Sequence, residues 1–482
     1  MAIADEWDDL AAVPCGKVEI YWDASWVNES AYLILEGGMS VTRDLVDPVL
    51  GLTSMAYAPL GSATLRMRNT DSRYSKSKSG SQANTYGIHN KQIRASLGYS
   101  AAYEVIFTGR IVDVSEAEAG ATVTLTCHDM GEDLMRQTAS SAMSTDQQTD
   151  VWIDTLAAAG GLAGADYSTE YGFFMLPYCY LESDKLLSEA QKAAASEGGV
   201  IFFDKDGVLQ FWNAGHWADS RSGYAFTEAL YAELVPRRDY DNKYNVATVE
   251  YETRAVAESA VVYNLRRTIC VPVNGTRTVT MRFRLPLAEY ESYDMAVVSG
   301  GGQDMSGDVT LSPTSPDGAQ SWTVTFTNAN TRHEAFVTKF EVLGKPVEGR
   351  SAEEHVYDPN SKAGTDEERN LQIRNNYYIQ QEGQALMLAE MATDRLTTEH
   401  LVVELRDVPA NPLLELGDRV TLTSTLTGVS VDVLIIGLRF TYGIAAKMTV
   451  IGVDVTNFYG YTTYFTIGSS ALGAASGEYL FY

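Results

Sequence analysis

Few residues in this chain have the chemistry and the spacing of an active site. Its six histidines are spread along the sequence, and none stands in an HExxH or HxH arrangement that would bring two imidazoles to one metal ion. The triplet Cys127-His128-Asp129 combines a thiol, an imidazole and a carboxylate, which suits metal binding or nucleophilic chemistry. However, the triplet ends an alternating strand pattern, in which neighbouring side chains point to opposite faces of a sheet. We therefore expect these three residues to be structural.

Three further segments resemble ligand-binding loops and lack the parts that would complete one. Asp204-Lys-Asp-Gly207 begins like a calcium loop, but no bidentate glutamate follows and the next residues form a strand pattern, so a hairpin turn is expected. Glu353-Glu354-His355 lies in a charged segment that should be solvated. Ser299-Gly-Gly-Gly302 lacks the lysine and the helix of a phosphate-binding loop.

We accordingly expect no catalytic, cofactor-binding or metal-binding residues, no cofactor and no enzymatic activity. A glycosidase with paired carboxylates is not tested by spacing, because the chain has 63 acidic residues.

The composition is that of a multidomain globular protein with a large acidic excess. A chain of 482 residues is too long for one hydrophobic core and indicates roughly three or four domains. Lysine and arginine number 36 against the 63 acidic residues, a net charge of −27, which argues against direct binding of nucleic acid. The acidic excess either keeps the protein soluble or forms a wall that repels DNA sliding past it.

The cysteines and the chain start point to a reducing compartment. Four cysteines are widely spaced and form no CxxC pair: Cys15, Cys127, Cys179 and Cys270. Such cysteines are expected to be free thiols. Residues 1–12 lack the basic and apolar regions of a secretion signal, and no apolar run approaches ~18 residues, so neither a signal nor a membrane span is expected. We expect a protein that is made in a reducing cytoplasm.

Hydrophobic periodicity divides the chain into strand-rich and helical stretches. Alternating segments such as Val18–Trp22 and Ala63–Arg68 predict strands up to about residue 140, interrupted by a mobile loop at Ser75–Asn90. Apolar residues then recur at helical spacing over Asp146–Ala159 and Ser183–Glu197, and a hairpin follows, which together predict a small α/β domain.

The second half of the chain repeats this alternation of classes. Residues 260–347 predict an antiparallel sandwich, with Thr276–Leu285 as its longest alternating run. A polar, charged linker, Glu348–Glu368, is expected to be flexible. Asn376–Leu396 has the strongest helical pattern in the chain, and strands follow it to Asp454.

A weak internal repeat is the most informative feature. Three segments near the N-terminus match three near the C-terminus in order, namely 94–99, 105–114 and 123–129 with 419–424, 433–442 and 448–454. The middle strand of each copy contains a glycine, Gly109 or Gly437, and such a glycine usually marks a bulge or bend. Antiparallel proteins in general share these patterns, but three strands in the same order favour two copies of one small barrel.

Four segments resemble parts of known proteins. They are Ala63–Tyr74, with its Asn-x-Asp-x-Arg-Tyr turn, Phe107-Thr-Gly-Arg-Ile111, the helix and hairpin of Ala195–Phe211, and the turn in Leu414–Val420. In this order they resemble the baseplate hub, or tail-associated, proteins of bacteriophages.

The resemblance implies a mainly β, multidomain fold with a small α/β domain. Residues 1–140 would be a first tube-like β-barrel and 141–215 the α/β domain. Residues 216–259 and 348–456, with the helix 376–396, would be a second tube-like barrel. The β-sandwich 260–347 would be inserted into this barrel, and residues 457–482 would be a C-terminal tail for attachment.

The resemblance also implies a structural role. Two similar barrels in each of three chains would make a ring with pseudo-sixfold symmetry. Such a homotrimer would join the tail tube and distal tail proteins to a tip or fibre protein. It would line the channel for passing genomic DNA without binding it specifically. The protein would lie at the tail tip of the virion after assembly in the host cytoplasm. There are two alternatives to the hub. One is a tail-borne adhesin that binds host-surface glycans through the sandwich, and the other is a peptidoglycan hydrolase.

Overall fold

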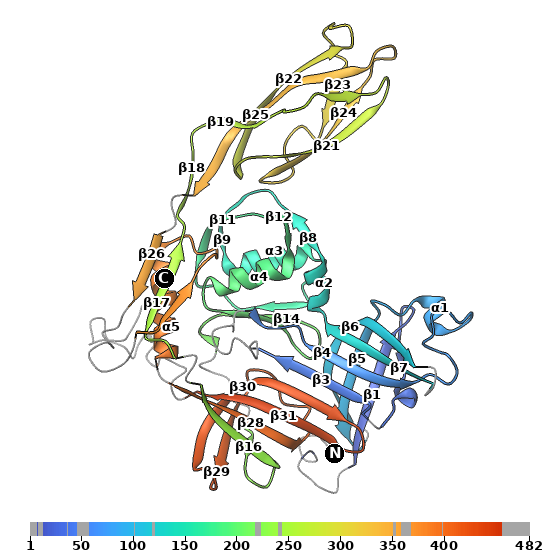
Figure 1. Ribbon diagram of the computed structural model, residues 1–482, viewed down its shortest axis with the longest axis vertical. Helices are drawn as coiled ribbons and strands as arrows, with labels where there is room; N and C mark the ends of the chain where they lie inside the picture. The colour runs from blue at the N-terminus through green and yellow to red at the C-terminus, as the bar shows by residue number, and fades with distance from the viewer. Residues whose placement is uncertain are drawn as a thin grey trace.

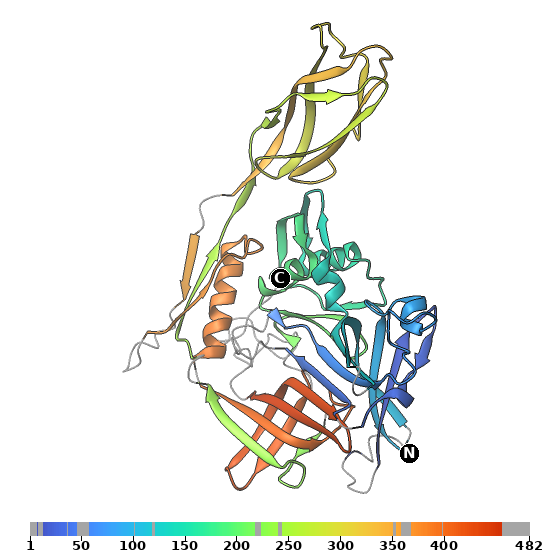
Figure 2. The same cartoon turned by 45° about the vertical axis from the view of Figure 1, so that its right-hand side comes forward.

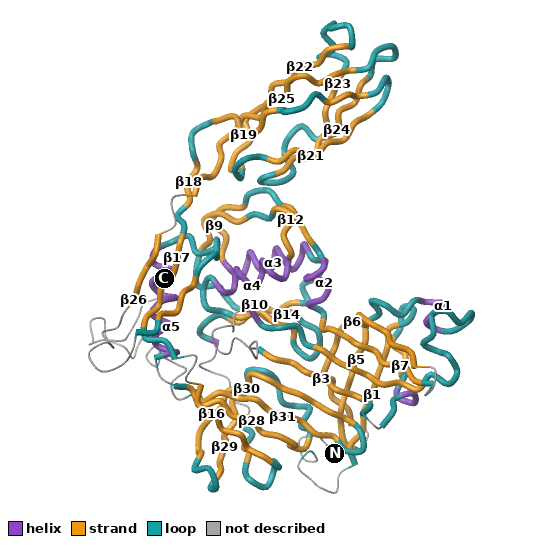
Figure 3. The backbone as a smooth tube through the Cα atoms, viewed as in Figure 1, coloured by secondary structure: helices purple, strands orange, loops and turns teal. Residues whose placement is uncertain are grey.

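A computed structural model of the chain describes residues 7, 13–35, 37–45, 57–100, 102–117, 121–216, 223–239, 243–349, 353–357, 368–397 and 399–455. The fold is mainly β and contains several antiparallel sheets, as the sequence predicts (Figures 1 and 3). Most helix lies in one α/β region and in one separate helix (Figure 3). No helix in the described part of the chain is long and apolar enough to cross a membrane. The predicted tail, 457–482, lies outside the described residues.

The largest sheet has 13 strands and takes them from both ends of the chain. The first half supplies β1 (Pro14–Tyr21), β2 (Trp26–Asn28), β3 (Met39–Asp44), β4 (Ser62–Arg68), β5 (Gln92–Tyr99), β6 (Ala102–Ala117) and β7 (Thr122–Asp129). The second half supplies β15 (Ala225–Phe226), β16 (Glu233–Asp239), β28 (His400–Pro409), β29 (Arg419–Ser424), β30 (Val429–Tyr442) and β31 (Ala446–Asp454). The strands of the two predicted barrels therefore belong to one continuous sheet, whose apolar faces share one large core.

The segment between β4 and β5 is more ordered than the sequence suggests. It contains the short helix α1 (Gln82–Tyr86), which begins at Ser81, where the side chain accepts a hydrogen bond from the Asn84 amide. Ala83 and Ile88 are buried in the main core. The predicted mobile loop is thus anchored by a cap and by two apolar side chains. A second short helical turn, η2 (Ser30–Tyr32), follows β2.

The α/β region packs two helices on small sheets. Its elements are α2 (Gly131–Arg136), β8 (Thr138–Ser140), β9 (Ser144–Gln148), α3 (Thr149–Ala159), β10 (Tyr167–Thr169), β11 (Met175–Cys179), β12 (Glu182–Lys185), α4 (Leu186–Ala195), β13 (Val200–Phe203) and β14 (Leu209–Trp212). Both helices start three residues later than predicted, because the residues before them pair as β9 with β11 and β12 with β8. The hairpin of β13 and β14 turns at Gly207, whose φ is +84°.

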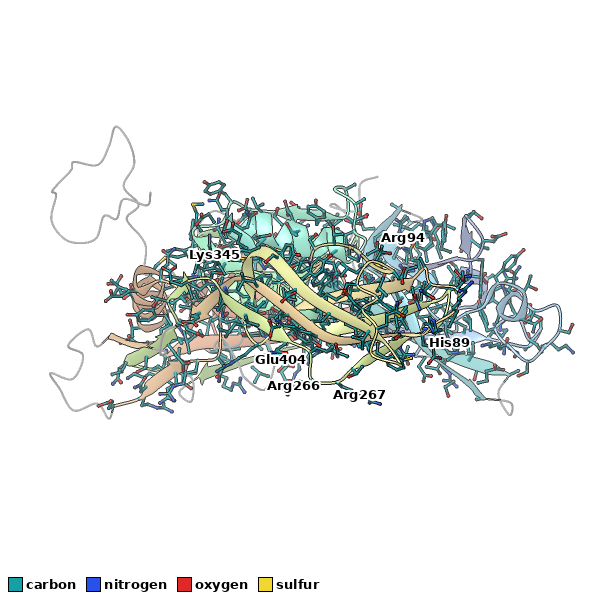
Figure 4. All side chains as sticks on the ribbon, turned by 90° about the horizontal axis from the view of Figure 1, so that it is seen from above. His89, Arg94, Arg266, Arg267, Lys345 and Glu404 are labelled. Carbon is teal, nitrogen blue, oxygen red and sulfur yellow. The ribbon has the colours of Figure 1, made fainter. Side chains whose placement is uncertain are left out.

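The inserted region forms a two-sheet unit with its own core. Its strands are β18 (Arg254–Val256), β19 (Ala260–Asn264), β20 (Ile269–Val271), β21 (Thr276–Arg282), β22 (Leu287–Ser299), β23 (Val309–Ser312), β24 (Ser321–Asn328) and β25 (Ala335–Gly349). Figure 2 shows this unit projecting from the rest of the chain on β18 and β25. Seen from above, it lies over the remaining domains, with Arg266 and Arg267 at one edge (Figure 4). The Ala319 amide donates a 2.8 Å hydrogen bond to the Ser141 carbonyl, which ties the unit to the α/β region.

A small sheet and a helix connect this unit to the second half of the large sheet. They are β17 (Val246–Tyr251), β26 (Glu353–Tyr357), β27 (Asn370–Ile373) and α5 (Glu382–Leu396). The predicted linker is therefore partly strand, because β26 pairs with β17 from Ala247 opposite Tyr357 to Tyr251 opposite Glu353. Helix α5 begins six residues after the predicted start at 376. The residues before it bind the α/β region instead, as when Gln380 Nε2 donates to the Tyr178 carbonyl at 2.7 Å.

Candidate assembly surface

The two halves of the large sheet meet at a seam between β3 and β30. β3 lies between β4 and β30, and its pairing with β30 runs from Met39 opposite Tyr442 to Asp44 opposite Gly437. At the end of the seam the Leu45 amide donates to the Ile436 carbonyl at 2.8 Å. The seam is therefore an antiparallel backbone ladder between segments far apart in the sequence (Figure 1).

One face of the sheet is polar across this seam. In-register pairing gives two lateral rows across β31, β30, β3, β4, β7 and β6: Thr449, Arg439, Thr42, Ser62, His128 and Arg110, then Lys447, Thr441, Ser40, Thr64, Thr126 and Asp113. None of these residues is buried, whereas their neighbours along the strands, such as Val41, Ala63 and Leu125, are buried. Short hydroxyl side chains dominate the two rows, and Asp113 is their one carboxylate. The surface suits contact with another large body better than enclosure of a small ligand.

Both halves carry the same irregularity in their long strand. The register between β6 and β7 shifts between Ile111 and Asp113, and the register between β30 and β31 shifts between Ile435 and Gly437. Each shift marks a bulge, which bends the strand. The strand order β5-β6-β7 is also repeated as β29-β30-β31. The two halves thus contain equivalent folded units, in agreement with the internal repeat.

The hydrogen bonds beside the bulges fix the equivalence residue by residue. Ile111 donates to Lys91 at 3.0 Å and accepts from the Asn90 amide at 2.8 Å. In the second half Ile435 makes the same two bonds, with the Asp418 carbonyl and the Gly417 amide, at 2.8 Å each. Asn90 and Gly417 both have positive φ, +64° and +83°. Ile111 and Ile435 are therefore equivalent, as are Asn90 and Gly417.

This equivalence corrects the alignment of the two mid-strand glycines. Two residues before the equivalent isoleucines, Gly109 corresponds to Val433, and two residues after them, Gly437 corresponds to Asp113. Each glycine has its own steric cause. A Cβ on Gly437 would lie 2.4 Å from the Asp44 carboxylate across the seam, and one on Gly109 would lie 2.1 Å from the His128 carbonyl. The bulge, rather than the glycine, is what the two copies share.

Gly417 offers a test of this geometry. A Cβ there would lie 2.5 Å from the Trp212 ring, and the positive φ is costly for alanine. We expect Gly417→Ala to lower the free energy of unfolding by about 2–3 kcal/mol, as measured by urea denaturation. Gly428→Ala is the matched control. Its φ is +68°, but nothing lies within 4 Å of its Cβ, so a loss of about 1 kcal/mol is expected. Equal losses would contradict the steric argument.

Buried charges gather where the halves and the α/β region join. Asp129, at the end of β7, accepts hydrogen bonds from the amides of Gly61 and Gly131. Burial raises the pKa of Asp129 to about 7, although these two bonds and the nearby Arg43 act to lower it. Arg43 of β3 is itself buried and forms an ion pair with Glu415, just before β29. These contacts hold β3, β4, α2 and β29 in one arrangement.

The structure does not bring the residues of the Cys127-His128-Asp129 triplet together. Cys127 is buried, and burial raises the pKa of its thiol well above the usual range, so it is a poor nucleophile. His128 points to the polar face, where its Nδ1 lies 2.7 Å from Glu132. Among the described residues, no cluster of three or more His, Cys, Asp or Glu side chains could hold a metal ion.

The other candidate loops have structural roles. The Asp204 carboxylate closes the β13–β14 turn by accepting hydrogen bonds from the amides of Asp206 and Val208, both at 2.9 Å. The backbone of His355 lies in β26, opposite Val249, and so belongs to a strand. Ser299 ends β22 and begins a turn, in which its hydroxyl accepts from the Gln303 amide at 3.1 Å.

Comparison with known proteins shows which of them share this arrangement of strands and helices. No family model matches the chain, and no curated protein matches it in sequence. Several solved structures do match the chain in three-dimensional structure. The 43 kDa tail protein of prophage MuSo2 from Shewanella oneidensis superposes over 91% of this chain and 98% of its own, with a TM-score of 0.51 at 12% identity. The tail protein of Neisseria meningitidis MC58 superposes over 92% and 97%, with a TM-score of 0.51 at 9% identity.

The chain has the fold of phage tail proteins. The match extends over nearly the whole length of both structures, so it includes both equivalent units and the regions between them. The resemblance seen in short sequence segments is thereby confirmed at the level of the fold.

Within this tail-protein fold, the Asn69–Tyr74 turn is held against the first unit by hydrogen bonds to a buried carboxylate. Glu29 is fully buried and accepts hydrogen bonds from Arg73, through Nε at 2.8 Å and Nη2 at 2.6 Å, and from the Tyr74 hydroxyl at 2.9 Å. Trp22 Nε1 donates a fourth bond, of 2.7 Å. Asn69 caps the turn by accepting from the Tyr74 amide at 3.0 Å. The sequence marks the turn, but it does not connect the turn to Glu29, because Arg73 and Tyr74 lie 44 and 45 positions from Glu29.

Proposed function

We propose that this protein is the structural hub of a phage tail tip. Three copies would form a pseudo-sixfold ring that joins the tail tube and distal tail proteins to a tip or fibre protein. The observation that supports this most strongly is the pair of equivalent units fused into one sheet, because three such chains would present six similar units to a tube. The tail-protein fold supports the same role. In this proposal the protein resides at the tail tip of the virion after assembly in the host cytoplasm.

The domain organisation in the proposal follows the predicted boundaries. The first barrel is 1–140, the α/β domain 141–215, and the second barrel 216–259 with 348–456. The sandwich 260–347 is an insertion. Its separate core and its stalk of β18 and β25 support treating it as a unit that projects toward other tail components.

The ring would also line the channel for genomic DNA. The polar face of the sheet is a suitable lining, because its hydroxyl rows offer weak and non-specific contacts. The acidic wall expected from the net charge does not extend over these two rows, whose one carboxylate is Asp113 against four basic side chains, Arg439, Arg110, Lys447 and, when protonated, His128.

The proposal includes no enzymatic activity, no cofactor and no bound metal. Supporting this, the candidate catalytic residues are separated or engaged in structural hydrogen bonds. The glycan-adhesin alternative rested on aromatic faces in the sandwich. However, Trp322, Phe326 and Phe340 are fully buried in its core, where they cannot stack on a sugar. Tyr293, at 37% exposure, is a large aromatic side chain of the described sandwich that remains open.

The mass of the purified protein in solution tests the hub. Light scattering should give a value near three times 52.7 kDa, and negative-stain images of that species should show closed rings with six lobes. A monomer that binds host glycans would instead support the adhesin, and clearing of peptidoglycan in a zymogram would support the hydrolase. Either result would contradict the hub as the main function.

A further inference from the structure

The seam within one chain shows how one unit joins the next. In the first unit β3 pairs with β4 of its own unit on one side and with β30 of the other unit on its second side. The second unit contains a strand in the place of β3. β16 pairs with β28 just as β3 pairs with β4, and β28 pairs with β31 just as β4 pairs with β7.

The register makes this second correspondence specific. Thr42 lies opposite Ser62, which lies opposite His128. In the second unit Arg237 lies opposite Val402, which lies opposite Val453. Since His128 and Val453 each precede the final aspartate of their strand, the segment Thr42-Arg43-Asp44 corresponds to Arg237-Arg238-Asp239.

Each unit has one edge that no described strand covers. β16 is an end strand of the large sheet, and no described strand pairs with its second side. β6 pairs with β7 along residues 109–117, but its pairing with β5 ends at Arg110. The stretch Val112–Ala117 therefore has no described strand on the side opposite β7. It corresponds to the part of β30 that β3 covers at the seam.

We propose that β16 of one copy pairs with Val112–Ala117 of β6 in a second copy and so repeats the seam between chains. This inference rests on the proposed ring and names the interface that closes it. The internal register, in which Thr42 lies opposite Arg439, places Arg237 opposite Ser115 of the next copy and Arg238 opposite Val114. The contact is head-to-tail, so repetition either closes into a ring or continues as a filament. Three copies would give six seams, three within chains and three between them.

In this register two arginines of β16 meet two carboxylates of β6, although the register also sets Asp239 opposite Asp113. Arg237 and Arg238 are exposed on β16, and Asp113 and Glu116 are exposed on β6. With Arg237 opposite Ser115, Arg237 is the diagonal neighbour of Asp113 on one face of the sheet. Arg238 is the diagonal neighbour of Glu116 on the other face. Diagonal neighbours in antiparallel strands lie ~7–8 Å apart, within reach of an arginine side chain.

Pro236 is compatible with pairing between β16 and β6 of a second copy. It corresponds to Val41, and residues of β3 in phase with Leu45 direct their amides toward β30. Proline at this position therefore leaves the ladder with β28 intact and removes one donor from the open side. The interchain ladder has one hydrogen bond fewer than the internal seam, which keeps isolated edges from pairing at random.

Cysteine pairs test the register. Arg237 and Ser115 would form a non-hydrogen-bonded pair with Cα atoms ~4.5 Å apart, which a disulfide can span. In a Cys270→Ser background, which removes the exposed native thiol, we expect Arg237→Cys with Ser115→Cys to give covalent dimers and trimers on a non-reducing gel. Each single variant should give at least tenfold less. Arg237→Cys with Ala117→Cys, displaced by two residues, is the register control and should also give at least tenfold less.

Charge reversal tests the complementarity independently. Reversing both arginines (Arg237→Glu with Arg238→Glu) should weaken trimer formation at least tenfold in light scattering, and so should Asp113→Arg with Glu116→Arg. The quadruple variant should restore the trimer. Arg277→Glu, on an exposed position of the insertion, is the matched control and should leave the mass unchanged.

The outcomes separate this interface from the ring itself. A wild-type trimer that gives no specific cross-link, and whose mass is insensitive to both reversals, would overturn the β16–β6 interface and leave the hub proposal standing. A wild-type protein that stays monomeric and forms no cross-link at high concentration would overturn both. Circular dichroism of each variant confirms that the fold is retained.

Discussion

Replacing Glu29 by alanine should destabilise the first unit by about 3–5 kcal/mol, because it removes the shared acceptor of a buried network. Arg73 would keep its charge at 18% exposure without its partner, and the donors of Trp22 and Tyr74 would lose theirs. Burial and the Glu29 charge raise the pKa of Tyr74 well above its usual range, so the hydroxyl stays protonated and depends on this acceptor. Thermal unfolding and amide hydrogen exchange between β4 and β5 would measure the loss.

Two variants separate the buried charge from its shape and location. Glu29→Gln keeps the size of the side chain and loses the charge, so a smaller loss of about 1.5–3 kcal/mol is expected. Glu291→Ala removes an exposed carboxylate of the insertion that accepts one 2.7 Å hydrogen bond from Ser259, and it should change stability by less than about 0.5 kcal/mol. Unchanged exchange protection in Glu29→Ala would show that the turn is held by other contacts.

Hydrophobic periodicity in the sequence predicted those elements whose position depends on which of their faces is buried. Alternation located strands such as β4, since one of its faces is buried and the other is polar. Helical periodicity located α5 but placed its start too early. Tyr378 and Gln380 continue the pattern, yet their side chains bind Glu189 and the Tyr178 carbonyl in the α/β region. Tertiary hydrogen bonds, which have no periodicity, decided where the helix begins.

The features that make the assembly surface depend on distant residues and could not be predicted. The repeat gave the right strand order, but it aligned Gly109 with Gly437, because a glycine is visible in a sequence and a bulge is not. The seam arises because β3 pairs with β30, and the sequence of neither strand identifies the other as its partner. In the same way, the sequence around His355 predicts a linker, because its pairing partner β17 lies about 100 residues earlier in the chain.

Stability should fall as the pH rises from about 4 to about 8, because two buried carboxyl groups are neutral in the folded chain at low pH. Burial raises the pKa of Asp129 to about 7 and that of Glu197 also to about 7. In the unfolded chain both groups have a pKa of about 4. A raised folded-state pKa contributes stability that is complete below about pH 4 and is lost as the pH passes 7. Linkage gives a loss of about 3 kcal/mol per group by pH 8.

Asp129→Asn and Glu197→Gln test this slope and serve as controls for each other. Urea midpoints at pH 4, 6 and 8, with hydrogen exchange to localise the change, should show a flatter pH dependence around β4 and α2 in the first variant. The second should flatten the pH dependence around α3 and α4. Asp129→Asn should also cost about 1–3 kcal/mol at pH 4, because the amide offers one acceptor to the two donors of Gly61 and Gly131. Stability that rises from pH 4 to 8, or an unchanged slope in both variants, would mean that these carboxyl groups ionise without penalty. The junction of the two units would then owe its cohesion to the Arg43–Glu415 ion pair and to the apolar core.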